Sequence, residues 1–198
     1  MRVVTYGFGM RSPIWRVGAA LAVLVAALAV GGCVEDDPDT TPSPDPTSTP
    51  LFESDEEALA AAEEAYARYQ AVEDVVFAEG GAGSERIEKV AVRDALEAGL
   101  AGAANFQRDG FHSVGTTTFD SLELQQLVAA EGNEDVVVAY ICLDFSGTDV
   151  LDKANISVVQ PGQLRRQPFQ VSFDWLQENS ALVLSSRDPW SGVDRCSE

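Results

Sequence analysis

Three cysteines carry the most definite chemistry in this chain, and the first, Cys33, follows a segment typical of an export signal. Residues 1–16 contain three arginines and no acidic residue, and residues 17–30 consist of Ala, Val, Leu and a single Gly. A charged start, an apolar core and small residues before a cleavage point form a signal peptide. The small Gly31 and Gly32 leave the next bond accessible to a signal peptidase, and a thiol at the cut accepts a diacylglyceryl group. The sequence therefore predicts a lipoprotein signal peptide over residues 1–32 and lipidation of Cys33.

Two alternatives are open for this segment. An uncleaved signal anchor is one, although an apolar run over residues 17–30 is short for a membrane span of about 20 residues. Cleavage without lipidation is the other, and it leaves Cys33 as an odd free thiol in an exported protein. We expect the lipidated form, with palmitate-like acyl chains in the cell membrane and the protein facing the extracytoplasmic side.

The other two cysteines form an even pair once Cys33 is lipidated. Disulfides form and persist in oxidising compartments, so we predict a Cys142–Cys196 disulfide that pins the C-terminal tail to the sheet. Two buried thiols are the alternative. With one histidine and no Cys-x-x-Cys in the chain, no metal site is expected. The glycine-rich run at residues 80–83 lacks the lysine of a phosphate-binding loop, and no cofactor is expected.

The chain is strongly acidic, with a formal net charge of −19. Removal of residues 1–32 takes away three arginines and leaves ten basic residues against thirty-two acidic ones, a charge of −22. Such a surface repels nucleic acid and anionic lipid headgroups. No nucleic-acid partner is expected, and attachment to the membrane would depend on the acyl chains of the lipid anchor.

Residues 33–50 form the predicted tether between the anchor and the folded domain. They contain five prolines among Asp, Ser and Thr and almost nothing that could enter a core. Proline-rich spacers are extended at about 3 Å per residue, so this one reaches up to roughly 50 Å.

The remaining residues, 51–198, suit one domain. Ser54 and Glu57 have the spacing of a capping box, which predicts a long helix that ends at the glycines of residues 80–83. Its apolar positions recur at helical spacing, with Glu73 outside them. These positions are Leu59, Ala62, Tyr66, Tyr69, Val72 and Val76.

Two further helices are expected, one from near Ser84 and one over residues 92–108. After residue 111 the pattern changes to strands, expected over residues 116–124, 135–145, 165–175 and 181–188. Turn residues at 131–133 and 160–162 are placed for hairpins. Helices that precede strands predict an α+β domain, with three N-terminal helices packed on a four-stranded antiparallel sheet.

A further set of residues recurs in one known family. The set consists of Tyr66 and Tyr69 in the first helix, the Phe-His-Ser-Val-Gly run at 111–115, Cys142-Leu143-Asp144 at a strand end, a Trp-containing strand and Cys196. In this order and spacing the chain resembles small actinobacterial lipoproteins of the nuclear transport factor two superfamily, over most of residues 54–196. The resemblance implies a cone-shaped fold, in which a strongly curved sheet wraps around the first helix and leaves a pocket at the wide end.

The resemblance also gives candidate pocket residues. Ketosteroid isomerases and polyketide cyclases share the implied fold and use pocket acids and bases, for which this chain offers His112, Asp120, Tyr140, Asp144 and Asp174. Each has a structural explanation as well, and no catalytic residue is assigned. The tentative ligand-binding residues are Tyr66, Tyr69, His112, Asp144, Phe173 and Trp175.

We therefore expect a non-enzymatic binding or interaction module of the cell envelope. Its partner would be another envelope protein or a small apolar ligand. A small isomerase- or cyclase-like pocket enzyme acting on an apolar substrate is the alternative. If the aromatic side chains prove fully packed, an interaction surface on the outside of the sheet becomes the better expectation.

Overall fold

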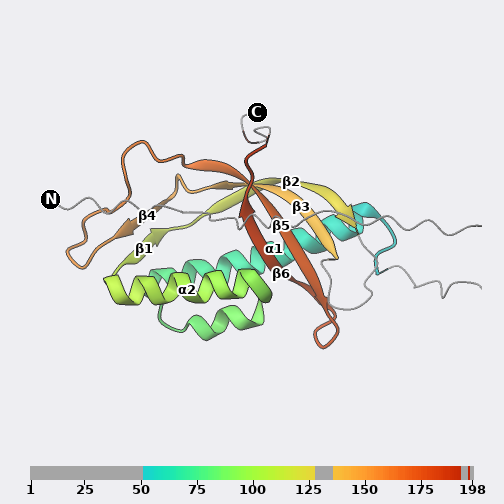
Figure 1. Ribbon diagram of the computed structural model, residues 1–198, viewed down its shortest axis with the longest axis horizontal. Helices are drawn as coiled ribbons and strands as arrows, with labels where there is room; N and C mark the ends of the chain where they lie inside the picture. The colour runs from blue at the N-terminus through green and yellow to red at the C-terminus, as the bar shows by residue number, and fades with distance from the viewer. Residues whose placement is uncertain (1–50, 128–135, 193–195, 197–198) are drawn as a thin grey trace, which may run out of the picture. The chain divides into compact units, whose positions relative to one another are not determined.

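The computed structural model describes residues 51–127, 136–192 and 196, which form an α+β domain (Figure 1). Its helices are α1 (Asp55–Ala78), the 3-10 helix η1 (Ser84–Lys89) and α2 (Arg93–Asp109). Its strands are β1 (His112–Gly115), β2 (Thr118–Leu127), β3 (Val137–Asp144), β4 (Thr148–Leu151), β5 (Arg166–Leu176) and β6 (Ala181–Pro189). The predicted fold class, with helices before strands, is confirmed.

Several expectations lie outside the described residues: the signal peptide over 1–32, Cys33, the tether over 33–50 and the turn at 131–133. Within the described part of the chain, no helix has both the length and the apolar character that a membrane span requires.

Helix α1 begins where the capping residues predict. The hydroxyl of Ser54 accepts a hydrogen bond from the backbone N–H of Glu57 at 3.2 Å, and the Glu57 carboxylate accepts one from the N–H of Glu53 at 2.7 Å. The helix stops before Gly80 and Gly81, whose φ angles of +67° and +86° suit residues without a side chain. Two polar residues of α1, Gln70 and Glu73, are buried. Six apolar residues of the helix are buried as well: Ala58, Ala62, Ala65, Tyr66, Tyr69 and Val76.

The main sheet has the strand order β2-β3-β5-β6, with antiparallel neighbours throughout. Figure 1 shows α1 and α2 on the same side of this sheet. Side chains alternate between the faces of a strand, and the face toward α1 is apolar. It presents Val137, Ala139, Ile141 and Leu143 from β3 and Val171 and Phe173 from β5, all fully buried.

A second sheet was not predicted. β1 and β4 pair antiparallel, from His112 opposite Leu151 to Gly115 opposite Thr148. Both strands have four residues, too few for an alternating pattern to stand out in the sequence. Because β4 lies between β3 and β5 along the chain, residues 160–162 belong to the loop after β4 and do not form a two-strand hairpin turn.

A bulge in β6 determines which of its side chains face the helices. Ser172 of β5 lies opposite Ser186, but Phe173 lies opposite Leu184, so Ser185 is an extra residue. Such an insertion reverses the alternation beyond it. Arg187 therefore lies opposite the core residue Val171 and faces α1, where regular alternation from Leu184 would place Ser186.

Candidate functional site

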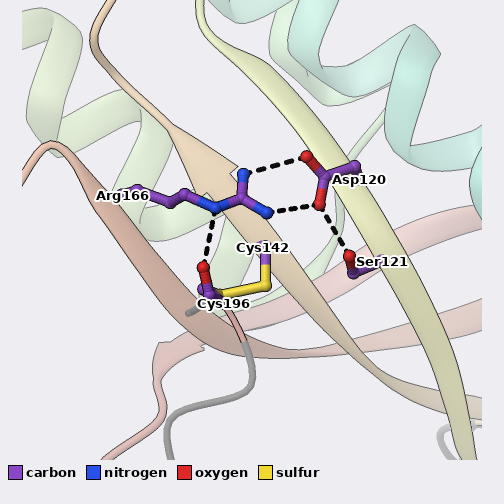
Figure 2. Close-up of a disulfide and its surroundings, with 5 residues drawn as sticks. All are labelled: Asp120, Ser121, Cys142, Arg166 and Cys196. Atoms are coloured by element: carbon purple, nitrogen blue, oxygen red, sulfur yellow. Dashed lines mark hydrogen bonds and ion pairs between the residues drawn. A yellow bond between two sulfur atoms is a disulfide. The ribbon is translucent and has the colours of Figure 1, made fainter. Parts of the chain in front are cut away.

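The predicted disulfide is formed between Cys142 on β3 and Cys196 (Figure 2). The sulfur atoms are 2.04 Å apart and the Cα atoms 5.6 Å. Cys142 alternates with the core residues Ile141 and Leu143, so the bond attaches Cys196 to the face of the sheet opposite α1.

Arg166 of β5 strengthens this attachment. Its Nε donates to the carbonyl of Cys196 at 3.0 Å, and its two terminal nitrogens donate to the carboxylate of Asp120 on β2 at 2.9 and 2.6 Å (Figure 2). Ser121 donates a further hydrogen bond to Asp120 at 2.7 Å. The bonds from Arg166 and Ser121 lower the pKa of Asp120, so this candidate acid is a charged structural group on the outer face of the sheet.

The outer face also carries an aromatic pair. The rings of Tyr140 on β3 and Trp190 have centroids 4.6 Å apart, and Tyr140 is 9% exposed. Trp190 and the disulfide therefore cover part of the surface that faces away from the helices.

Tyr66 and Tyr69 belong to a buried polar cluster between α1 and β6. The Tyr69 hydroxyl donates to Glu73 at 2.8 Å, and Arg187 forms two hydrogen bonds with the same carboxylate. The guanidinium carbon of Arg187 lies 5.2 Å from the centre of the Tyr69 ring. Burial raises the pKa of Tyr66 to about 12 and also raises that of Tyr69. Both phenols therefore hold their protons more tightly than an exposed tyrosine does.

A small cavity of about 170 Å³ adjoins this cluster. Its walls come from α1, α2 and β6, and they consist of Tyr69, Asp94, Ala95, Ala98, Arg187 and Asp188. Tyr69 is the one tentative pocket residue among them.

The structure does not bring the tentative pocket residues together, which corrects the expectation of a shared pocket. Tyr66 and Phe173 are fully buried, and Trp175 packs edge-on against Phe52 with ring centroids 6.0 Å apart. Asp144 pairs with Arg166 at the start of β5, so Trp175, nine residues further along that strand, lies about 30 Å away. His112 is in the separate two-stranded sheet.

Asp144 has a local structural role. Its carboxylate accepts a hydrogen bond from the backbone N–H of Ser146 at 2.7 Å, and bonds from Ser146 lower the pKa of Asp144. It therefore ends β3 and stabilises the turn into β4, as its position at the end of a predicted strand suggested.

A larger groove of about 450 Å³ lies between the first two turns of α1 and the C-terminal half of β2. The lining residues are Asp55, Glu56 and Leu59 of α1 and Leu124, Gln125, Gln126 and Leu127 of β2. Sequence reasoning missed this groove because Leu59 was assigned to the buried helix face, whereas the side chain is only half-buried. No local pattern indicates that Leu59 and Leu127 share a surface.

No group of three or more His, Cys, Asp or Glu side chains within the described ranges is arranged to hold a metal ion.

Comparisons with known proteins add little to this geometry. No protein-family model matches the chain, and no curated protein matches it. A crystal structure of the intermembrane space region of the chloroplast protein ARC6 is similar at 15% sequence identity and a TM-score of 0.48, covering 66% of this chain and 95% of that one. A similarity at this level carries no argument about function. The resemblance to the nuclear transport factor two superfamily stays a prediction.

Proposed function

We propose that the protein is a lipid-anchored, extracytoplasmic interaction domain of the cell envelope that binds another envelope protein. The observation that carries this proposal is the packing of the side chains expected to form a pocket. Tyr66 and Phe173 are enclosed by other side chains, and Glu73, the buried acid beside the tyrosines, is occupied by Arg187 and Tyr69. A general base must reach its substrate proton, and this carboxylate is already engaged by two donors.

Two observations support the location. The small-residue run before Cys33 follows an apolar segment and an arginine-containing start, and this order is that of an export signal. The Cys142–Cys196 disulfide suits an oxidising compartment. The proline-rich tether would allow the acidic domain to reach partners some distance from the bilayer.

The anchor is tested by substitution of Cys33 and by mass measurement. In the native host, we expect the wild-type protein in the membrane fraction with a diacylglyceryl mass on an N-terminal Cys33. Cys33→Ser should abolish the diacylglyceryl modification. The variant protein should then either be released from the membrane or keep its signal peptide. Cys142→Ala/Cys196→Ala serves as the control, because it removes the other two thiols and should leave lipidation intact. An unmodified Cys33, or a mature N-terminus elsewhere, would overturn the proposal.

The interaction role is tested by crosslinking in intact cells followed by detergent extraction. We expect the anchored protein to be recovered with a specific envelope protein, and we expect Phe173→Leu, a core change, to leave that recovery intact. Recovery without any partner, together with turnover of an apolar substrate that Tyr69→Phe abolishes, would favour the pocket enzyme instead.

A further inference from the structure

The two edge strands of the main sheet, β6 and β2, differ in how far their outer backbone groups are hydrogen-bonded. At β6, residues 90–92 pair with Leu184: the N–H of Val92 donates to Leu184 at 2.8 Å, and the N–H of Leu184 donates to Val90 at 3.2 Å. At β2, no backbone hydrogen bond from the described residues reaches the outer side of the strand. Bulges after Asp120 and Leu124 interrupt its register, so a long added strand would pair poorly there.

The groove beside β2 combines apolar walls with an acidic mouth. Leu59, Leu124 and Leu127 contribute the apolar part, and Leu127 is 37% exposed. Asp55 and Glu56 are exposed at the start of α1, and hydrogen bonds from the backbone and from Ser54 lower the pKa of Glu56. None of the described residues that line the groove is a lysine or an arginine. The described walls of the groove therefore place two acidic side chains beside three leucines.

We propose that this groove binds a cationic segment of an envelope protein. An apolar side chain of the segment would lie against Leu59, Leu124 and Leu127, and flanking Lys or Arg side chains would face Asp55 and Glu56. The inference rests on the proposed interaction function and names the chemistry of the partner. Complementary charge sets the association rate and the specificity of such contacts, and apolar burial contributes affinity.

Charge disfavours the other occupants. A second copy of the chain that docked groove to groove around a two-fold axis would bring the same carboxylates together and meet like charge. The segments that adjoin its lining residues in the sequence, 45–50 and 128–135, contain acidic residues and no Lys or Arg. Anionic lipid headgroups are repelled for the same reason. A basic protein segment matches both the apolar and the acidic parts of the groove.

The test uses the full-length lipidated protein in non-ionic detergent and two fluorescent dodecapeptides. One has a leucine pair flanked by lysines, and the other has the lysines replaced by glutamates. We expect the lysine peptide to bind at least about tenfold more tightly than the glutamate peptide. Its affinity should fall several-fold between 0.05 and 0.5 M NaCl, because salt screens exposed charges.

Matched variants locate the binding. Asp55→Asn/Glu56→Gln should weaken lysine-peptide binding by about fivefold or more, whereas Glu85→Gln/Glu88→Gln, an equal loss of charge on η1, should change it less than about twofold. Leu127→Lys should abolish binding and Ile156→Lys, a change at another exposed aliphatic residue, should not. Circular dichroism confirms folding of each variant.

Equal weakening by both acid pairs, or no discrimination between the peptides, would overturn the inference. So would concentration-dependent dimerisation that Leu127→Lys removes, because the occupant would then be a second copy. None of these outcomes affects lipidation or partner recovery in cells, which test the proposed function separately.

Discussion

Arg187 on β6 and Glu73 on α1 form an ion pair with hydrogen bonds of 2.7 and 2.8 Å. The Glu73 side chain is 9% exposed and that of Arg187 25%. Burial alone lowers the pKa of Arg187, but the nearby Glu73 carboxylate and the two tyrosines raise it well above its ordinary value. This ion pair joins two side chains that are both largely buried. It therefore couples the first helix to the last described strand.

Removal of one partner from this pair should destabilise the domain strongly. Glu73→Gln or Arg187→Met leaves a largely buried charge without its counter-ion, and such changes cost about 3–5 kcal/mol. We expect the lower end of that range for Glu73→Gln, because Arg187 keeps some contact with water. Urea unfolding measures the loss.

The double variant Glu73→Leu/Arg187→Met is the informative comparison. It removes both charges, so it should recover much of the stability that either single change loses. The exposed pair Glu64–Arg68, at 2.8 Å, gives the surface control, where Glu64→Gln should cost less than about 1 kcal/mol. Strictly additive losses at Glu73 and Arg187 would contradict the coupling.

Loss of the disulfide should destabilise the domain and free its C-terminal end. The bond joins residues 54 positions apart, and on the chain-entropy model closure of such a loop is worth roughly 4 kcal/mol. Cys142→Ala/Cys196→Ala should lower the free energy of unfolding by about that amount and shift the fluorescence of Trp190, which packs on Tyr140. Cys33→Ala is the control and should change neither. A loss below about 1 kcal/mol would contradict this expectation.

The sequence was sufficient for the parts of the fold that depend on local pattern. The cap at Ser54, the glycine end of α1, the strand expected over residues 165–175 and the pairing of Cys142 with Cys196 all appear in the structure within a few residues of their predicted positions. Each is decided by neighbouring residues, or by a count, and does not require knowledge of which strands pair.

The parts that were wrong depend on contacts between distant segments. Glu73 was placed outside the apolar positions of the first helix because it is charged, although its spacing from Tyr69 and Val76 puts it on their face. The sequence of the helix does not show what an opposing strand presents to such a residue. The structure places Arg187 there through the bulge at Ser185, and no local pattern in β6 indicates that bulge. The prediction of a shared pocket was wrong for a related reason. The sequence assigns Phe173 and Asp144 to strands, but it does not give the register of those strands, and the structure places the two residues at opposite ends of the β3–β5 pair.

Asp74 should give the domain an unusual pH dependence. Its carboxylate accepts a hydrogen bond from Gln70 at 3.0 Å, but burial outweighs its hydrogen bonds and raises its pKa in the folded state. The unfolded value is about 3.9. The folded state therefore holds more protons above that pH, and the contribution of Asp74 to stability falls as pH rises through the raised pKa.

Urea unfolding of Asp74→Asn and Asp120→Asn between about pH 2 and pH 7 tests this sign. The stability of Asp74→Asn relative to wild type should increase as pH rises and then level off. Asp120→Asn should behave in the opposite way, because the folded pKa of Asp120 is lowered and its contribution is present above about pH 3.9 and lost as pH falls. Parallel profiles for the two variants would contradict the assignment.

Two glycines with nearly the same φ angle allow the cost of steric contact to be measured separately from the cost of backbone strain. Gly81 has φ of +86° and Gly162 has φ of +82°. A Cβ atom on Gly81 would lie 2.1 Å from the carbonyl oxygen of Ala103 on α2, whereas one on Gly162 would meet nothing within 4 Å. Both alanine variants incur the left-handed backbone cost of about 1–2 kcal/mol, but only Gly81→Ala must also displace α2.

We therefore expect Gly162→Ala to lower the free energy of unfolding by about 1 kcal/mol and Gly81→Ala to lower it by about 2 kcal/mol more, as overpacking typically does. Displacement of α2 would also weaken the hydrogen bond from Gln107 to the Gly81 carbonyl, now 2.6 Å. Gln107→Ala should consequently cost less in the Gly81→Ala background than in wild type, because the bond is already impaired there. Equal losses for the two alanine variants would show that α2 is not held against the turn after α1.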